Sequence, residues 1–209
     1  MATLLHVKVS VLGKLSFSIR LAEAFLESYR ASHAGDKVAT LDLAKDRIPE
    51  FGRLAVSAKY RILHGQPHTK VEARAWQSVV RTIEDLKQAD KLLVSCPMWN
   101  FSIPYRLKHY LDVVAQPGYT FSYTPEEGYK GLLTGRKAML ILARGGEYKP
   151  GTPTAAYDFQ KPYLEGILGF MGYSVDSLVV EPTLMAGPQV AEEKLAEAIP
   201  IAREKAKAF

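Results

Sequence analysis

The sequence contains very little cysteine and no long apolar run. Cys96 is the single cysteine among 209 residues, so an internal disulfide is excluded. A lone thiol says little about compartment, but it fits a reducing cytosol. No apolar stretch approaches the roughly 20 residues that a membrane-spanning helix needs. Met1–Lys8 also lacks the apolar core and cleavage site of a signal peptide, so we expect a cytoplasmic protein without a membrane anchor.

Runs of like charge and metal-ligand patterns are also missing. The net charge is +5, but Lys and Arg are scattered, which disfavours nucleic acid as a partner. The positive surplus leaves two interpretations open, attraction of anionic small molecules and simple solubility. His64 and His68 are four residues apart, but Gly65 and Pro67 interrupt the helix that a metal-binding pair would need. We therefore expect no metal site.

What is present is an ordinary globular composition, with 47% apolar and 23% charged residues. The length suits one domain, residues 1–209, that buries its core without disulfides or structural metal. Strand-like and helix-like segments alternate along it. We expect strands at Leu4–Ser10, Lys37–Leu43, Leu92–Cys96, Ala138–Ala143 and Ser174–Val180. We expect helices at Ser18–Ser32, Arg53–His64, Thr69–Gln88, Pro104–Ala115, Ala155–Met171 and Gln189–Ala208.

This alternation predicts an α/β fold, a five-stranded doubly wound parallel sheet with helices on both faces. Ligands of such sheets bind outside the carboxyl ends of the strands, where the strand order reverses. The loops after the first, third and fourth strands are therefore the places to search for function. The polar, aromatic segment Gln116–Gly135 and the segment Arg144–Thr154 are both expected to be loops.

The loop after the first strand carries Ser10, Ser16 and Ser18 and opens a helix. It matches neither a Rossmann fingerprint nor a P-loop. The free N–H groups and positive dipole end of a helix N-terminus bind phosphate, and the hydroxyls would add donors. The alternative is that one serine merely caps the helix, although Ile19 and Leu21 stand where a capping box would have Glu or Gln. The pattern favours phosphate binding.

Large apolar residues crowd the loop after the third strand, where small polar turn residues are usual. Trp99 and Phe101 would pack on a flat ring, and Asn100 offers a donor and an acceptor to its edge. The alternative is that these residues plug the end of the core or a subunit interface. Cys96 lacks the Arg of a phosphatase loop, since Ser102 stands there, so we expect a buried, small residue.

Paired glycines, Gly145 and Gly146, follow the fourth strand, and they allow close approach of the backbone to a ligand. The alternative is a flexible turn. Arg144 is either a solvated charge or a partner for an anionic ring. Together the three loops place a phosphate cradle, an aromatic slot and a glycine rim at one sheet edge. That combination predicts a mononucleotide with a large flat ring.

The sequence resembles the FMN-dependent NADH azoreductases, which also reduce quinones, within the flavodoxin-like superfamily. The resemblance is sharpest over Pro97–Asp112, P-M-W-N-F-S-I-P-Y-R-L-K-H-Y-L-D, and it covers most of the chain. It continues through Gly118–Tyr123, Gly131–Lys137, Arg144–Gly146 and Leu168–Gly172. The three loop serines match the family's phosphate-loop serines in order and spacing. Trp99, Phe17 and Ala143 depart from the family's usual Tyr, polar and hydroxyl residues, which leaves the preferred acceptor open.

The resemblance implies a flavodoxin-like fold, FMN as cofactor and a homodimer with active sites at the interface. The connection Ala44–Asp90 would supply part of that interface. The implied cofactor-binding residues are Ser10, Ser16, Phe17, Ser18, Met98, Trp99, Asn100, Phe101, Ala143, Arg144, Gly145 and Gly146.

The chemistry would belong to the flavin, so no side chain is expected to be catalytic. NADH or NADPH would deliver electrons, and a quinone or azo compound would take them from the same slot in a ping-pong sequence. We expect Tyr123, Tyr148 and Phe170 to line that slot; the two tyrosines are alternatively plain surface-loop residues. Two other functions stay open, a flavodoxin-type electron carrier without its own acceptor and a flavin-sensing scaffold.

Overall fold

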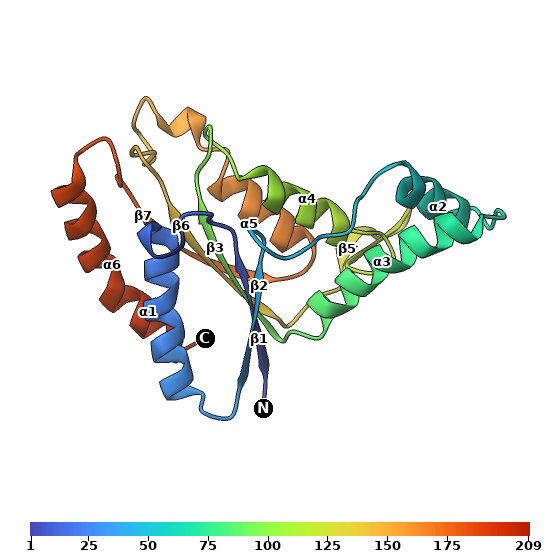
Figure 1. Cartoon of the computed structure of the whole chain (residues 1–209), viewed down its shortest axis with the longest axis horizontal. Coiled ribbons are helices and arrows are strands. Elements are labelled where there is room, and N and C mark those ends of the chain that lie inside the picture. Colours follow the sequence, from blue (N-terminus) through green and yellow to red (C-terminus); the bar gives the residue numbers. More distant parts are fainter.

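The computed structural model describes residues 1–209 and places a parallel sheet between two helical layers (Figure 1). Its strands are β1 (Thr3–Lys8), β2 (Lys37–Asp42), β3 (Lys91–Pro97), β6 (Lys137–Ala143) and β7 (Ser174–Val180). They pair in the order β2-β1-β3-β6-β7, and every pairing is parallel. β3 and β6 are apolar almost throughout because helices cover both of their faces. The predicted five-stranded α/β sheet is confirmed.

Six helices complete the two layers, namely α1 (Phe17–Ser32), α2 (Arg53–Leu63), α3 (Lys70–Lys87), α4 (Tyr105–Val114), α5 (Lys161–Phe170) and α6 (Pro188–Lys207). α1 and α6 pack together over one core, and α3, α4 and α5 cover the larger core on the other face. Figure 1 shows α2 and α3 extending beyond the sheet as a helical hairpin. No helix has the length and apolar character needed to cross a membrane.

The hairpin of α2 and α3 is tied together by one carboxylate. Thr69 and Glu72 form a capping box at the start of α3. The Ser57 hydroxyl on α2 donates to Glu72 Oε1 over 2.6 Å. This bond, together with the Thr69 backbone N–H, lowers the pKa of Glu72 to about 2. The long connection between β2 and β3 is therefore an ordered helical hairpin and not a loose loop.

Two segments differ from the sequence prediction. The expected loop Gln116–Gly135 contains an antiparallel hairpin, β4 (Phe121–Thr124) and β5 (Gly128–Gly131), because its alternating aromatic residues favour strands despite the surrounding glycines. The expected helix Ala155–Met171 begins only at Lys161, because Asp158 Oδ1 accepts the N–H groups of Gln160 and Lys161 and starts the helix there. Ala155–Tyr157 is a separate 3₁₀ turn.

Candidate active site

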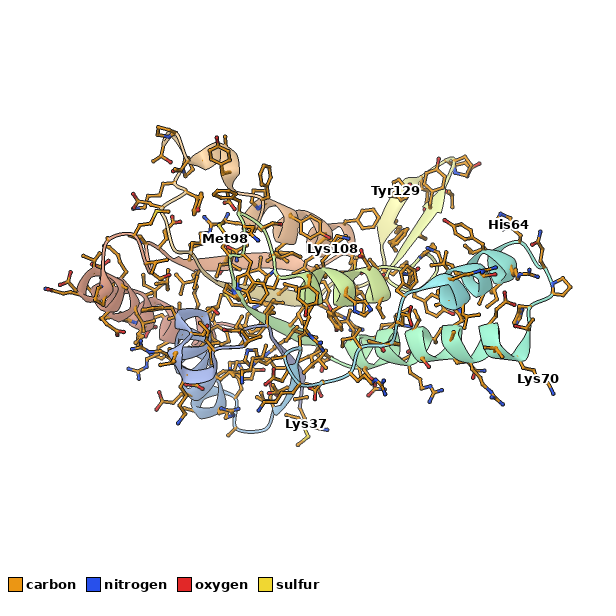
Figure 2. The ribbon with its side chains drawn as sticks, turned by 45° about the horizontal axis from the view of Figure 1, so that its top comes forward. Lys37, His64, Lys70, Met98, Lys108 and Tyr129 are labelled. Atoms are coloured by element: carbon orange, nitrogen blue, oxygen red, sulfur yellow. The ribbon has the colours of Figure 1, made fainter.

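The loops after β1, β3 and β6 lie at the carboxyl edge of the sheet, because all three strands are parallel neighbours. Val9 N–H donates to the Ser95 carbonyl over 3.1 Å, which joins the ends of β1 and β3. Met98 N–H donates to the Ala143 carbonyl over 2.8 Å and joins the ends of β3 and β6. Figure 2 labels Met98 at this edge. The structure thus places the three sequence-predicted loops side by side.

The serine loop leaves the N-terminus of α1 open to a ligand. Ser16 occupies the N-cap position, but its side chain makes no cap hydrogen bond. Its Oγ lies instead 3.1 Å from Ser18 Oγ. The backbone N–H groups of Phe17, Ser18 and Ile19 have no acceptor within the protein. The plain-cap interpretation is therefore not realised, and the helix keeps the donors and dipole that attract an anion.

The third serine, Ser10, helps to shape the same loop. Its Oγ accepts the N–H of Leu12 over 3.2 Å, which turns the chain after β1. Ser10, Ser16 and Ser18 are all buried, with at most 5% of each residue exposed. Buried hydroxyls need hydrogen-bond partners. Ser16 and Ser18 find only each other in the protein, so both retain capacity for a further partner.

The aromatic loop is a tight two-residue turn. Trp99 and Ser102 exchange backbone hydrogen bonds of 2.9 and 3.0 Å, and Asn100 and Phe101 between them have φ of 47° and 68°. A positive φ is uncommon for Asn and strained for Phe, at a cost of about 1–3 kcal/mol. The Phe101 ring contacts those of Tyr148 and Tyr157 at centroid distances of 6.2 and 5.2 Å. Trp99 and Phe101 nevertheless stay 38% and 45% exposed, so the turn presents apolar rings to a ligand.

The glycine loop also leaves donors free. The N–H groups of Gly145 and Gly146 have no acceptor in the protein, whereas the Gly145 carbonyl accepts the N–H groups of Leu184 and Met185 at 3.1 and 2.9 Å. A Cβ on Gly146 would lie 3.0 Å from Met185 Sδ, so a side chain there would meet this neighbour. Ala143, which precedes the loop, is buried at the end of β6. The Gly145 carbonyl thus fixes the loop to Leu184 and Met185, while the N–H groups of both glycines are free to donate to a ligand.

Arg144 is not the solvated charge that was one interpretation of the sequence. Its side chain is 2% exposed and pairs with Asp158 Oδ2 at 2.8 Å and Glu181 Oε2 at 3.3 Å. Its Nε donates to Gln160 Oε1 over 3.1 Å. All three sides of the guanidinium are therefore engaged within the protein. Direct binding of a cofactor by Arg144 stays a prediction.

Cys96 and the metal-ligating side chains offer no further chemistry. Cys96 is fully buried, as predicted from the sequence. Burial raises the pKa of its thiol to about 12, so it is neither a nucleophile nor a ligand at neutral pH. No three His, Cys, Asp or Glu side chains gather in a way that could hold a metal ion.

The three predicted substrate-slot residues lie in two places. Tyr148 is 8% exposed and packs beside Phe101, so it belongs to the site. Tyr123 and Phe170 instead belong to an aromatic cluster at the β4–β5 hairpin, where Tyr129 contacts both rings at centroid distances of 4.8 and 5.5 Å. α5 is ~15 Å long, and it runs from the carboxyl edge to Phe170 at the opposite edge.

Figure 2 shows this separation, with Tyr129 on the hairpin well away from Met98 at the end of β3. Within one chain, the structure does not bring Tyr123 and Phe170 to the three loops. Tyr123 is 58% exposed, in keeping with its alternative as a surface aromatic. The sequence pattern could not reveal this separation, because it depends on the direction in which α5 runs.

A groove of about 970 Å³ adjoins the aromatic turn and was not foreseen from the sequence. It is lined by Trp99 and Asn100 together with Phe51, Tyr105, Phe159 and Tyr163. Tyr105 and Phe159 are 72% and 56% exposed. Tyr105 lies off the buried stripe of α4, which is the signal that could have revealed it. Residues of the serine and glycine loops do not line this groove.

Comparisons with known proteins agree with this arrangement. A protein family described as having a flavodoxin-like fold matches residues 2–206. The FMN-dependent NADH:quinone oxidoreductase of Nitratidesulfovibrio vulgaris (strain DP4) is 49% identical over 210 residues, covering 100% of both chains.

Solved structures are similar over the whole chain as well. An azoreductase from Bacillus anthracis str. Sterne superposes with a TM-score of 0.92 at 33% identity, covering 100% of both chains. An FMN-dependent NADH-azoreductase from Bacillus anthracis str. Ames Ancestor, in complex with FMN, has a TM-score of 0.88 at 27% identity and covers 99% of this chain and 97% of its own. The chain belongs to the family of FMN-dependent NADH:quinone oxidoreductases and azoreductases with a flavodoxin-like fold.

Proposed function

We propose that the protein binds FMN at the carboxyl edge of its sheet and passes electrons from NADH to quinones or azo compounds. One observation carries the proposal: two sets of unpartnered N–H groups, at the start of α1 and at Gly145–Gly146, flank an exposed aromatic turn. A flavin mononucleotide has an anionic phosphate at one end, a ribityl chain in the middle, and a flat ring with a polar edge at the other end. The names and the FMN complex of the relatives support the same cofactor.

The residues present fit FMN, and each has a definite task. The N–H groups of Phe17, Ser18 and Ile19 would hold the phosphate, with the hydroxyls of Ser16 and Ser18 beside them. Trp99, Phe101 and Met98 would cover the ring and its side chain. When bound, FMN supplies the redox chemistry by accepting and then donating two electrons.

The protein's own contribution to catalysis is orientation and electrostatics. Gly145 and Gly146 would direct N–H groups at the ring edge where negative charge grows on reduction. The proposal assigns no proton transfer to a side chain. The ring face beside Trp99 would take both substrates in turn, which makes the sequence ping-pong.

A second copy of the chain would complete the substrate slot. The groove of about 970 Å³ beside Trp99 is open, and the hairpin rings of Tyr123 and Tyr129 are 58% and 67% exposed. Large exposed apolar surfaces of this kind mark association sites. In a homodimer, Tyr123 and Phe170 of one copy would face the flavin of the other. We place this enzyme in the cytoplasm, where its one thiol would stay reduced.

The first experiment is a visible spectrum of the purified protein loaded with FMN, followed by anaerobic NADH and then a quinone. We expect NADH to bleach the flavin band and the quinone to restore it. If NADH fails, NADPH is tried; a bound flavin that neither donor bleaches would favour the electron-carrier alternative. Absence of FMN binding would contradict the proposal outright.

The dimer has its own test. Sedimentation should give twice the chain mass, and Tyr123→Ala should raise the KM for quinone about tenfold while FMN affinity stays within about twofold. Ile201→Ala, which removes an exposed apolar side chain on α6, serves as the comparison for a general surface effect. A fully active monomer would contradict the shared slot.

A further inference from the structure

A buried charged cluster lies directly behind the site and has no role in the function proposed above. It consists of the Arg144 guanidinium, the carboxylates of Asp158 and Glu181, and the amide of Gln160. Asp158 and Glu181 side chains are 11% and 9% exposed, and Gln160 is fully buried. The one guanidinium pairs with both carboxylates, and Lys149 lies near Glu181 on its other side. Such a cluster is costly to bury, and replacing it by apolar residues is often neutral or stabilising.

The cluster reaches the loop after β3 through the segment Asp158–Gln160. Gln160 Nε2 donates to the Cys96 carbonyl over 3.2 Å, at the end of β3. Phe159 N–H donates to the Phe101 carbonyl over 3.0 Å, within the strained turn. Residues Asp158–Gln160 therefore connect the two parts: they bond to the loop after β3, and they also bond to Arg144 in the cluster. A substitution in the cluster would therefore be felt at the loop of Trp99 and Phe101, where the flavin ring is proposed to bind.

Glu181 links the cluster to the glycine loop in a second way. Its Oε2 accepts both Arg144 Nη1, at 3.3 Å, and the backbone N–H of Tyr148, at 3.1 Å. Arg144 and Tyr148 flank the glycine pair, so one carboxylate ties both ends of the loop. The Arg144 carbonyl accepts the Thr183 N–H at 2.8 Å, which fixes the loop from the β7 side as well. Between these ties, the N–H groups of Gly145 and Gly146 are left without an acceptor.

We infer that Glu181 is a positioning residue: it sets the direction of the Gly145 and Gly146 N–H groups, and its charge opposes reduction of the bound flavin. The inference rests on the proposed function, because the N–H groups matter only if FMN is their ligand. A negative charge near a group that gains electrons lowers its reduction potential. Glu181 therefore holds the donors in place and at the same time keeps the reduced flavin a strong donor to quinones.

Two substitutions separate these effects. Glu181→Gln keeps an acceptor for Tyr148 N–H and removes the charge; Glu181→Ala removes both. Glu204→Gln, on the exposed end of α6, removes an equal charge far from the site, where Glu204 pairs only with Lys207. Each variant is measured for FMN affinity by fluorescence quenching, for flavin midpoint potential, and for amide hydrogen exchange of residues 145–148 without FMN.

We expect Glu181→Gln to bind FMN within about twofold of the parent and to shift the midpoint potential to more positive values. Glu181→Ala should weaken FMN binding about tenfold and speed amide exchange at residues 145–148, while Glu204→Gln changes neither. A Gln variant with an unchanged potential, or an Ala variant with unchanged affinity and exchange, would overturn the inference. If the parent protein binds no FMN, the proposed function fails, and the exchange data alone still decide whether Glu181 holds the loop.

Discussion

The two edges of the central sheet use their polar groups in opposite ways. At the amino edge, Asp36 accepts the Tyr29 hydroxyl at 2.7 Å and the Ala2 N–H at 2.6 Å, and it pairs with Lys91 at 3.5 Å. Arg136 donates to the carbonyls of Lys87 and Ala89, each over 2.7 Å, which ties the end of α3 to the start of β6. These donors and acceptors satisfy one another.

At the carboxyl edge, by contrast, several backbone N–H groups have no partner, among them those of Phe17, Ser18, Ile19, Gly145 and Gly146. Exposed rings and a strained turn lie between them. The bonds of Asp36 and Arg136 at the amino edge contribute to stability, and the unpartnered N–H groups at the carboxyl edge are available to a ligand. The comparison predicts that substitutions at the two edges change different measurable quantities.

The largest expected effect is at the carboxyl edge. Ser16→Asp would cap α1 and place a negative charge where the FMN phosphate is proposed to bind. Asp is a good N-cap residue and favours the helix dipole, so the apoprotein should be as stable as the parent or more stable by about 0.5 kcal/mol. FMN affinity should fall about 100-fold or more through charge repulsion. Equilibrium unfolding and fluorescence titration measure the two quantities.

Ser16→Asn is the matched control, because Asn caps a helix as well but carries no charge. It should lose much less affinity than the Asp variant. If the Asp variant bound FMN as tightly as the parent, the phosphate would not lie at the start of α1. The unpartnered N–H groups there would then have no role in binding FMN.

An effect of comparable size, on stability and not on FMN binding, is expected between the edges, at His6 in the core under α1. Its Nε2 lies 2.8 Å from Ser95 Oγ. Burial, followed by the charges of Lys8 and Arg30, lowers its pKa from 6.5 to about 4. The unfolded chain therefore binds this proton at a higher pH than the folded chain, so His6 favours folding fully above its unfolded pKa. This contribution of about 3 kcal/mol is lost as the pH falls from about 6.5 to about 4.

Urea unfolding over that pH range measures the effect. His6→Gln keeps a partner for Ser95 without a titrating ring, so its stability should fall less steeply with acid than that of the parent. His68→Gln, at an exposed position, should leave the change of unfolding free energy with pH the same as in the parent. Equal slopes for the parent and the His6 variant would show that His6 does not control acid stability.

The smallest effect is expected at the amino edge. Arg136→Met leaves the carbonyls of Lys87 and Ala89 without a donor and should cost about 2 kcal/mol of unfolding free energy. FMN affinity should stay within about twofold, because the change lies at the opposite edge. Lys137→Met removes an exposed bond to the Ala208 carbonyl and should cost under about 0.5 kcal/mol. Loss of FMN affinity in the Arg136 variant would contradict the conclusion that the amino edge affects stability alone.

Much of the fold could be predicted from local pattern. Each of the five sheet strands was predicted: central strands such as β3 form short apolar runs, and β2 shows an alternating pattern. The β4–β5 hairpin was missed, since its glycines suggest a loop and its strands are formed by aromatic residues such as Phe121 and Tyr129. The late start of α5 was missed because it depends on two hydrogen bonds that Asp158 Oδ1 accepts from the N–H groups of Gln160 and Lys161.

The site was predictable to the level of loops and not of individual contacts. Parallel strands bring their carboxyl ends together, so the serine, aromatic and glycine loops had to lie at one edge. Nothing local could show that Arg144 is buried against Glu181, a residue 37 positions away, or that Phe170 lies at the opposite edge.

The sequence by itself determined the succession of the five sheet strands and six helices along the chain, the buried thiol of Cys96 and the chemistry of the three loops, because these follow from residue type and short-range periodicity. The tertiary structure alone decided which donors stay unpartnered, how Glu181 ties the glycine loop and where the hairpin aromatics lie. The physical reason is that hydrogen-bond satisfaction and burial depend on groups distant in sequence, which only the packed chain brings within reach.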